Sequence, residues 1–537
     1  MEPLSALGVG IVYSPSLEPL IEGGGDLINV LEIEPQPYWI KQSMHPPSYH
    51  LDERAFERIL HWPQKKIVHG VGIPVGGSLG LDDGQMAPFL ESVSRLNPEW
   101  ISEHLAFLRA DSSQGPYHTG FLLPPLQSLE TVQMAIQNIR RFKSNLSVPF
   151  AFENAPNYLR PVPQELPDGE FLARISEEAD CGILLDMHNL WCNERNGRQP
   201  VRDVLASLPL DRVWEIHLAG GDEYKGYWLD AHSGLVPEKL IDLCFEWFPK
   251  LLNLKAIIFE IIPDYIEAKS IDIKTLLTQL HVLQELWKCR GRNAPDTLDG
   301  KVNLRPAREH GDLPMPIDWE QALGSLVNKR PPQSDLQLRI SADPGIGVLQ
   351  QLVASVRSGM FVDLLTLSYR LMVLHLGEAS VWKVMEVYWN QTFPDPFAAE
   401  ETRRFADFIR DLELPVPHLN EVLAYEVASL ESLKTGKETI VDFSCHPITL
   451  LEALSVGTLP DQLPLGRYEV VVQLDAWNKS NGSSIPNLNV SRRPSMLGDM
   501  PARNKIDEAR RLPPEQRLLI ALEPSDAEAV LHRADLG

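Results

Sequence analysis

The stretch CGILLD at residues 181–186 is a short apolar run that ends in an acidic residue, Asp186. Five other apolar runs in the first 260 residues likewise end in a side chain that can bind a metal. Those five side chains are His69, His104, Glu153, His217 and Glu260. Successive members of the six are 35, 49, 33, 31 and 43 residues apart, which fits one strand followed by one helix.

Two further strand-like runs, at 9–12 and 28–33, bring the number to eight. Amphipathic stretches lie between the runs; in 129–142, for example, apolar residues recur at helical spacing. Eight strand–helix repeats predict an α/β protein whose first domain, residues 1–292, is a (β/α)8 TIM barrel. Because the C-terminal ends of all eight strands meet at one mouth of such a barrel, we expect the six terminal side chains to converge there.

The composition is that of a globular protein of two or three domains, with 537 residues, 44% of them hydrophobic and 23% charged. The net charge of −24 weighs against nucleic acid as a partner, because an acidic surface repels phosphate. No run of 18 apolar residues is present and the N-terminus lacks the features of a signal peptide, so we expect no membrane span. Five dispersed cysteines without CxxC pairs indicate reduced thiols and a cytoplasmic protein.

The pattern changes after residue 292. Residues 293–335 are rich in Arg, Asn, Pro and Asp and show little periodicity, so we expect a linker there. A second, α+β domain is expected over 336–537, with helices over 343–435 and a β-rich part over 438–537. In the β-rich part, 468–474 is a predicted strand, 478–505 is typical of a polar loop, and short helices are expected at 515–522 and 526–532.

Three more candidate ligands lie beside the strand ends. His188 follows Asp186 by two residues, and Asp230 and His232 lie in the loop after the seventh strand. Imidazole and carboxylate ligands without cysteine suit iron, manganese or zinc. Because one ion needs about three or four protein ligands, nine are enough for two or three ions with bridging carboxylates. The nine candidates are His69, His104, Glu153, Asp186, His188, His217, Asp230, His232 and Glu260.

Three interpretations of this set follow from the residues alone. Taken singly, a histidine at a strand end is more often a hydrogen-bonded structural residue, but nine such side chains at one mouth rarely arise by chance. A divalent-metal isomerase or endonuclease of the xylose-isomerase-like type also gathers His, Asp and Glu at its strand ends. Five histidines among the nine favour iron, and the acidic charge disfavours the endonuclease. The third interpretation is a non-catalytic protein that binds metal or peptide.

The motifs around these residues resemble those of the multinuclear non-heme iron-dependent oxidases, the family of the methanobactin-biosynthesis oxidase. The resemblance spans roughly residues 7 to 288 and is carried by an ordered set of short motifs. They are VHGVG at 68–72, SEHLA at 102–106, FEN at 152–154, LLDMHN at 184–189, EIHLAG at 215–220, DAHSG at 230–234 and FE at 259–260.

This resemblance implies a barrel that holds two or three iron ions (Fe2+/Fe3+), with dioxygen as co-substrate. Such enzymes oxidise a residue, often cysteine, of a ribosomally made precursor peptide. Asp230 is additionally a candidate base for a proton-transfer step, because it lies on a loop at the mouth. His188 stands where many members have Asn, which favours a third metal, and the loop at 34–36 reads EPQ where the family often has Pro-Glu-Asn.

The C-terminal region resembles the partner proteins that accompany these oxidases as separate subunits. The likeness is carried by residues 369–378, 405–409 and the turn Cys445-His446-Pro447. Such partners bind the leader of the precursor peptide, and here the partner would be fused to the enzyme. We expect an extended leader to pair with an exposed strand such as 468–474. Cys445 and His446 by themselves are too few ligands for a metal site.

Overall fold

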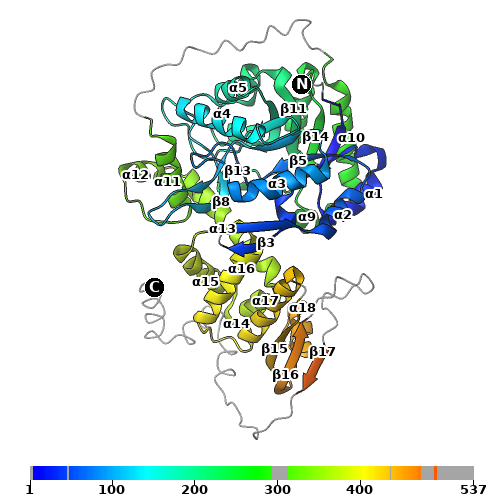
Figure 1. Cartoon of the computed structure of the whole chain (residues 1–537), viewed down its shortest axis with the longest axis vertical. Coiled ribbons are helices and arrows are strands. Elements are labelled where there is room, and N and C mark those ends of the chain that lie inside the picture. The colour runs from blue at the N-terminus through cyan, green and yellow to red at the C-terminus, as the bar shows by residue number, and fades with distance from the viewer. Residues whose placement is uncertain (1–3, 45–46, 293–312, 436, 473–488, 493–537) are drawn as a thin grey trace. The chain divides into compact units, whose positions relative to one another are not determined.

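The computed structural model describes residues 4–44, 47–292, 313–435, 437–472 and 489–492 (Figure 1). The chain forms two compact units, residues 1–353 and 354–537. The division therefore falls later than the expected domain end at 292. The helices expected at 515–522 and 526–532, and all of the polar loop at 478–505 except residues 489–492, lie outside the described residues.

The first unit contains a closed barrel of eight parallel strands, as the sequence predicts. Every strand is almost completely buried, because one face lines the barrel interior and the other lies under the helices. The strands, in their order around the barrel, are β1 (Gly8–Val12), β14 (Ala256–Glu260), β11 (Val213–Ala219), β10 (Gly182–Asp186), β9 (Phe150–Glu153), β6 (Ile101–His104), β5 (Lys65–Gly70) and β2 (Val30–Ile33).

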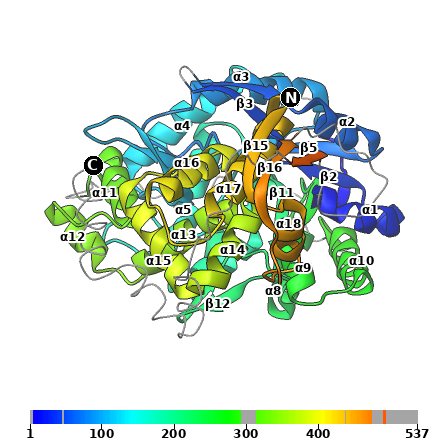
Figure 2. The ribbon, with the colours of Figure 1, turned by 90° about the horizontal axis from the view of Figure 1, so that it is seen from below.

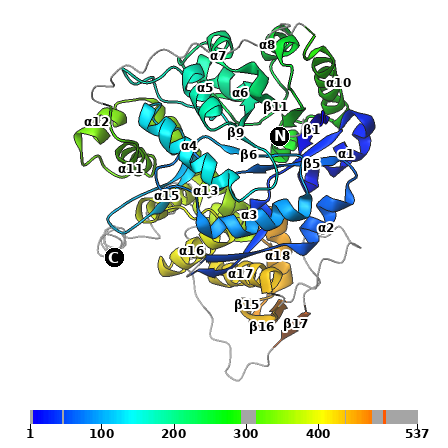
Figure 3. The same cartoon turned by 45° about the horizontal axis from the view of Figure 1, so that its top comes forward.

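Helices surround the strands (Figure 3). Side chains start several of them: Asp52, Asp82, Ser128, Asp186 and Asp272 each accept a hydrogen bond from a first-turn backbone N–H. The helices are α1 (Glu18–Gly24), α2 (Glu53–His61), α3 (Asp83–Leu96), α4 (Leu129–Lys143), α5 (Asp168–Glu178), α6 (Met187–Arg195), α7 (Val201–Ser207), α8 (Glu238–Trp247), α9 (Pro263–Ala268) and α10 (Ile273–Cys289). Short 3-10 turns are η1 (Pro15–Leu17), η2 (Gly25–Leu27), η3 (Gln36–Tyr38), η4 (Leu210–Arg212) and η5 (Phe248–Lys250).

Three β-hairpins, which the sequence did not reveal, follow the C-terminal ends of β2, β6 and β11. All three therefore extend from the end of the barrel that carries the candidate ligands. They are β3 (Trp39–Met44) with β4 (Pro47–Leu51), β7 (Phe107–Ala110) with β8 (Tyr117–Leu123), and β12 (Asp222–Tyr224) with β13 (Tyr227–Leu229).

The segment expected to be a linker contains a helix, α11 (Pro316–Val327), which α12 (Asp335–Ser341) follows. Trp319 and Leu323 of α11 are buried in one apolar cluster with Phe107 and Leu123 of the β7–β8 hairpin. Glu320 of α11 accepts hydrogen bonds from the backbone N–H and the hydroxyl of Ser78. This stretch is therefore part of the first unit, and its buried apolar side chains hold it there. The proline-rich residues on either side of it favoured the prediction of a linker.

The second unit has a helical part followed by a sheet, as expected (Figure 2). The helices are α13 (Gly345–Leu364), which begins in the first unit, α14 (Thr366–Leu376), α15 (Glu378–Gln391), α16 (Ala398–Asp411), α17 (Leu419–Thr435) and α18 (Pro447–Ser455). The antiparallel sheet has the order β15 (Thr439–Cys445), β16 (Leu465–Val472), β17 (Asn489–Arg492). Helices and strands share one apolar core, in which Phe361 stacks on Phe405 at 4.0 Å.

Within the described ranges, no single helix is long and apolar enough to cross a membrane. Only α13 and α14 taken together reach that length and composition, and the pair is bent by 104°.

Candidate metal centre

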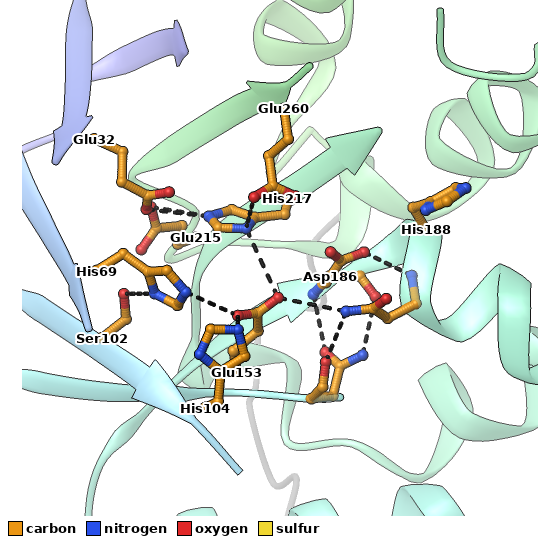
Figure 4. A network of polar contacts seen from close by, with 12 residues as sticks. Glu32, His69, Ser102, His104, Glu153, Asp186, His188, Glu215, His217 and Glu260 are labelled. Atoms are coloured by element: carbon orange, nitrogen blue, oxygen red, sulfur yellow. Dashed lines mark hydrogen bonds and ion pairs between the residues drawn. The ribbon is translucent and has the colours of Figure 1, made fainter. Parts of the chain in front are cut away.

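His69, His104 and Glu153 come together from three neighbouring strands, β5, β6 and β9 (Figure 4). The Nε2 atoms of both histidines lie 3.1 Å from Glu153 Oε2. The other ring nitrogen of each is held by the barrel: Nδ1 of His69 lies 2.8 Å from Ser102 Oγ, and Nδ1 of His104 lies 3.1 Å from the carbonyl oxygen of Gly70. Both imidazoles therefore present Nε2 to the same carboxylate oxygen.

His217 on β11 has a similar arrangement. Its Nε2 lies 3.1 Å from Glu32 Oε2, while its Nδ1 lies 3.2 Å from Glu260 Oε1 and 3.8 Å from Glu153 Oε1. Asp186 ends β10, and its Oδ1 accepts the backbone N–H of Asn189 at 2.7 Å, which caps α6. Ligand atoms of Asp186, Glu153 and His217 lie within 4.8 Å of one another, so this group adjoins the first.

Asp230, directly after β13, joins the remaining two histidines. Its Oδ1 lies 2.9 Å from His188 Nδ1 and 3.0 Å from His232 Nε2. His232 Nε2 also lies 3.5 Å from Glu260 Oε2, and its backbone has φ +47°, uncommon for a residue other than glycine. One continuous series of contacts therefore connects eight of the nine residues that the sequence singled out, and the ninth, Asp186, lies within 4.8 Å of Glu153 and His217.

Charges within the cluster compensate each other. Burial on its own would lower the pKa of His104, but the Glu153 and Glu103 carboxylates outweigh it and raise the pKa to about 9. Burial on its own would raise the pKa of Glu153, but His104 and His69 outweigh it and lower the pKa to about 2. Burial raises the pKa of Asp186 well above its usual range, and the Asp230 and Glu260 carboxylates add to this. A bound cation would replace the protons that balance these carboxylates.

Several ligand-type atoms of the cluster make no hydrogen bond to any residue that the structure describes, although each is buried. Of the five such atoms, four lie within 3.5 Å of an opposite ligand atom without making a hydrogen bond, so the group has capacity for a further partner at the mouth. A metal ion is a partner that suits this donor set of imidazole nitrogens and carboxylate oxygens. The atoms are Glu153 Oε2, Asp186 Oδ2, His217 Nδ1, His232 Nε2 and Glu260 Oε2.

Sequence reasoning missed the acidic residues of β2 and the loop after it. Glu32 is fully buried and orients His217, and Glu215, beside His217 on β11, accepts a hydrogen bond from Trp100 Nε1 at 2.8 Å. Burial raises the pKa of Glu34, and the charges acting on it include those of His69 and Glu260. The available signal was a charged residue inside a strand otherwise made of apolar residues, since such a residue is buried only with a partner.

His188 also has neighbours that the sequence did not reveal. Trp228 Nε1 donates to His188 Nε2 at 3.1 Å, and Cys192 Sγ lies 3.8 Å from His188 Nδ1. Since Nδ1 also contacts Asp230, both ring nitrogens of His188 are occupied. Trp228 comes from the unpredicted β12–β13 hairpin, which explains why sequence spacing could not place it.

A family model described as RiPP precursor modification enzyme MbnB/TglH/ChrH matches residues 21–270. A UPF0276 protein of Bordetella pertussis is 31% identical over 208 residues, which are 37% of this chain and 71% of that protein. The chain belongs to the MbnB/TglH/ChrH family. All nine candidate ligands lie within the matched residues.

Other comparisons are more partial. A UPF0276 protein of Anaeromyxobacter sp. is 33% identical over 180 residues, 34% of this chain, and the chain spans about three fifths of that relative's length, 62%. Among solved structures, D-allulose 3-epimerase from Methylomonas sp. is 11% identical with a TM-score of 0.36, over 53% of this chain and 99% of that one.

Proposed function

We propose that this chain is an iron- and dioxygen-dependent oxidoreductase that modifies a residue, cysteine first of all, of a ribosomally synthesised precursor peptide in the cytoplasm. Membership of the MbnB/TglH/ChrH family supports a precursor peptide as the substrate. The donor set at the barrel mouth, rich in imidazole, supports iron.

One observation carries the proposal. His69, His104 and His217 each have one ring nitrogen tied to the barrel and the other directed at Glu153. Partners that hold the outer nitrogen fix the ring orientation and raise its affinity for a metal. Glu153 turns Oε2 toward two of these imidazoles and Oε1 toward the third, which suits a carboxylate that bridges two ions.

When bound, iron would supply one-electron chemistry with dioxygen and a binding position for a substrate thiolate. The protein's part is to hold the reacting groups and exclude water. Asp230 is nearly buried, and although burial favours its neutral form, His232 and His188 outweigh this and hold its pKa below the usual range. A carboxylate with so low a pKa accepts protons weakly, which favours a ligand role for Asp230 over the base role.

The number of ions depends on His188. In the present arrangement its Nδ1 contacts Asp230 and its Nε2 accepts from Trp228. His188 therefore orients Asp230 through its Nδ1 contact. It would bind a third ion only after one of these two contacts is released. We propose two ions held by the residues around Glu153 and Glu260, with the third as an additional, weaker site.

The second unit would bind the leader. The strand expected to pair with it, now β16, has both edges occupied by β15 and β17. In the described part of the sheet, β15 is an outer strand, and a cavity of about 490 Å3 lies between it and α17. Ala424 and Val427 of α17 and Ile440 of β15 line this cavity. We therefore propose β15 as the strand that an extended leader joins.

The test uses the iron-loaded full chain and each short cysteine-bearing peptide encoded beside its gene. We expect dioxygen uptake and a mass change in one of these peptides, neither of which occurs without oxygen. Full iron occupancy with no oxygen uptake for any of these peptides would remove the oxidase proposal. Sugar epimerisation by the manganese- or zinc-loaded protein would instead support the isomerase interpretation.

A further inference from the structure

The second unit contains a cluster of metal-binding side chains that belongs to no part of the barrel. It consists of His418, Glu421 and Cys445, whose ligand atoms lie within 4.8 Å of one another. His418 directly precedes α17, Glu421 lies on the first turn of α17, and Cys445 is the last residue of β15. These two elements pack against each other (Figure 2).

The distances in this cluster are those that a tetrahedral ion needs. His418 Nδ1 lies 3.0 Å from Glu421 Oε2, and Cys445 Sγ lies 3.9 Å from the same oxygen. With zinc bonds of about 2.0 Å to N and O and about 2.3 Å to S, tetrahedral ligand atoms lie about 3.3 Å apart for N and O and about 3.5 Å for S and O. For these two pairs, shifts of a few tenths of an ångström reach the tetrahedral separations, and the ligand atoms of His418 and Cys445 lie within 4.8 Å of each other.

Glu421 is already oriented for this role. Ser444 donates to Glu421 Oε1 from both its backbone N–H, at 3.0 Å, and its hydroxyl, at 2.5 Å. The second oxygen, Oε2, is thereby directed at His418 and Cys445. A carboxylate whose outer oxygen is held by hydrogen bonds is the usual form of a metal-ligating carboxylate.

The combination of residue types points to one class of ion. A thiol, an imidazole and a carboxylate together match the mixed S, N and O sites of zinc. None of the nine barrel candidates is a cysteine, although Cys192 lies beside His188 and Asp230. Cys445 is completely buried, whereas the side chains of His418 and Glu421 are 18% and 22% exposed, so an ion can enter from their side. Glu421 also lines the cavity of about 490 Å3.

We propose that His418, Glu421 and Cys445 bind one divalent ion of the zinc class, which fastens the start of α17 to the end of β15. Binding releases the thiol proton to solvent and leaves the sulfur as a thiolate ligand. The ion thereby links the helical part of the second unit to its sheet. This inference concerns residues outside the proposed oxidase site and does not depend on the oxidase activity.

The experiment uses Co2+ as a spectroscopic substitute for Zn2+ in the full chain, because a thiolate bound to Co2+ gives a near-ultraviolet charge-transfer band that imidazole and carboxylate ligands do not. We expect this band in the unaltered protein, with an intensity that saturates at one cobalt–thiolate site per chain once Co2+ exceeds the barrel sites, and its loss when Zn2+ is added in excess. The variant Cys445→Ser should lack the band. In His418→Ala, where the cysteine remains, Co2+ affinity measured from the band should fall at least about tenfold.

Two control variants make the assignment specific. Cys192→Ser removes the cysteine beside the barrel candidates and should keep the band. His446→Ala removes the neighbouring histidine, whose side chain caps α18, and should keep it as well. A band that is absent from the unaltered protein, or that disappears in Cys192→Ser but persists in Cys445→Ser, would overturn the proposal. Far-ultraviolet circular dichroism of each variant identifies one that has lost its fold; should Cys445→Ser do so, the His418→Ala titration decides the outcome.

Discussion

Glu153 is the residue on which the barrel cluster depends, because two imidazoles contact one of its oxygens and a third approaches the other. We expect Glu153→Gln to lower bound iron to less than half of normal and peptide turnover by at least about 100-fold. Elemental analysis and the peptide assay measure these effects. Glu57→Gln, an exposed carboxylate on α2, is the matched control and should change neither. Full iron content in Glu153→Gln would show that Glu153 is not a ligand.

Trp228 limits the number of ions in our proposal, since its indole N–H occupies His188 Nε2. Trp228→Phe keeps an aromatic ring but removes this donor. We expect affinity for the additional ion to rise about tenfold, which corresponds to one hydrogen bond of about 1.4 kcal/mol that no longer has to be released. Titration with Fe2+ under anaerobic conditions, with ions counted per chain, measures this. An unchanged count and affinity would contradict the role assigned to Trp228.

At the residue scale, the sequence was a good guide to side chains at strand ends and a poor one to those that support them. All nine strand-end and loop candidates lie in one cluster, because barrel geometry brings strand ends together whatever the intervening loops do. Glu32 and Trp228 were missed for different reasons. Glu32 lies within a strand and not at its end, where the candidate ligands were sought. Trp228 lies on a hairpin, and the spacing of strands in the sequence does not predict where a hairpin folds.

Helix α11 is attached to the barrel by a buried acidic residue, Glu320, whose carboxylate accepts hydrogen bonds from the backbone N–H of Ser78. Burial, only partly opposed by these hydrogen bonds, raises the pKa of Glu320 to about 7. The folded state therefore binds a proton that the unfolded chain, with a pKa near 4.3, releases. We expect the free energy of unfolding of the first unit to fall by up to about 3 kcal/mol as pH rises from about 4.5 to about 7.

Chemical denaturation across this pH range measures the effect. Glu320→Gln, which cannot ionise, should remove most of the pH dependence of the free energy of unfolding. Asp318→Asn, at an exposed position on the same helix, should leave it intact. A pH dependence unaffected by Glu320→Gln would mean that another group binds the proton.

In the second unit, α13 and α16 are joined by a buried ion pair. Arg357 Nε donates to Glu401 Oε1 at 2.7 Å, and both side chains are almost completely buried. We expect Arg357→Met to destabilise this unit by up to about 3 kcal/mol, because it removes one of the two arginines that pair with the buried Glu401 carboxylate, while Arg404 keeps its contact. The double variant Arg357→Met with Glu401→Leu should recover part of that loss, and urea unfolding of both variants measures the difference. Equal losses in the single and double variants would argue against this explanation.

At the element scale, the eight barrel strands were predictable because each is a short apolar run repeated at one spacing. The same reasoning predicted helices over 343–435, the range in which α13 to α17 lie. It failed for α11, whose contacts are to β7 and β8, some 200 residues earlier in the chain. The local sequence pattern of a hairpin does not show which distant segment of the chain will cover its apolar face.

For the whole molecule, the compact division after residue 353 has a measurable consequence. A chain ending at 292 lacks Trp319 and Leu323, and so exposes Phe107 and Leu123 of the β7–β8 hairpin. We expect this chain to melt at a lower temperature than one ending at 353 and to aggregate, since each large apolar side chain left uncovered costs about 1.5–3 kcal/mol. Differential scanning calorimetry and light scattering compare the two. Equal melting temperatures would place the end of the barrel unit at 292.

The sharing of carboxylate oxygens in the cluster also constrains how such a protein can evolve. Glu153 serves imidazoles from β5, β6 and β11, and Asp230 serves one from α6 and one from its own loop. A substitution on any one strand therefore disturbs ligands on others, so single steps away from the present set lose function before they gain any. We therefore expect the residues of the cluster to change together among relatives, and new specificity to arise first in the hairpins around the mouth, at positions other than Trp228, which contacts His188.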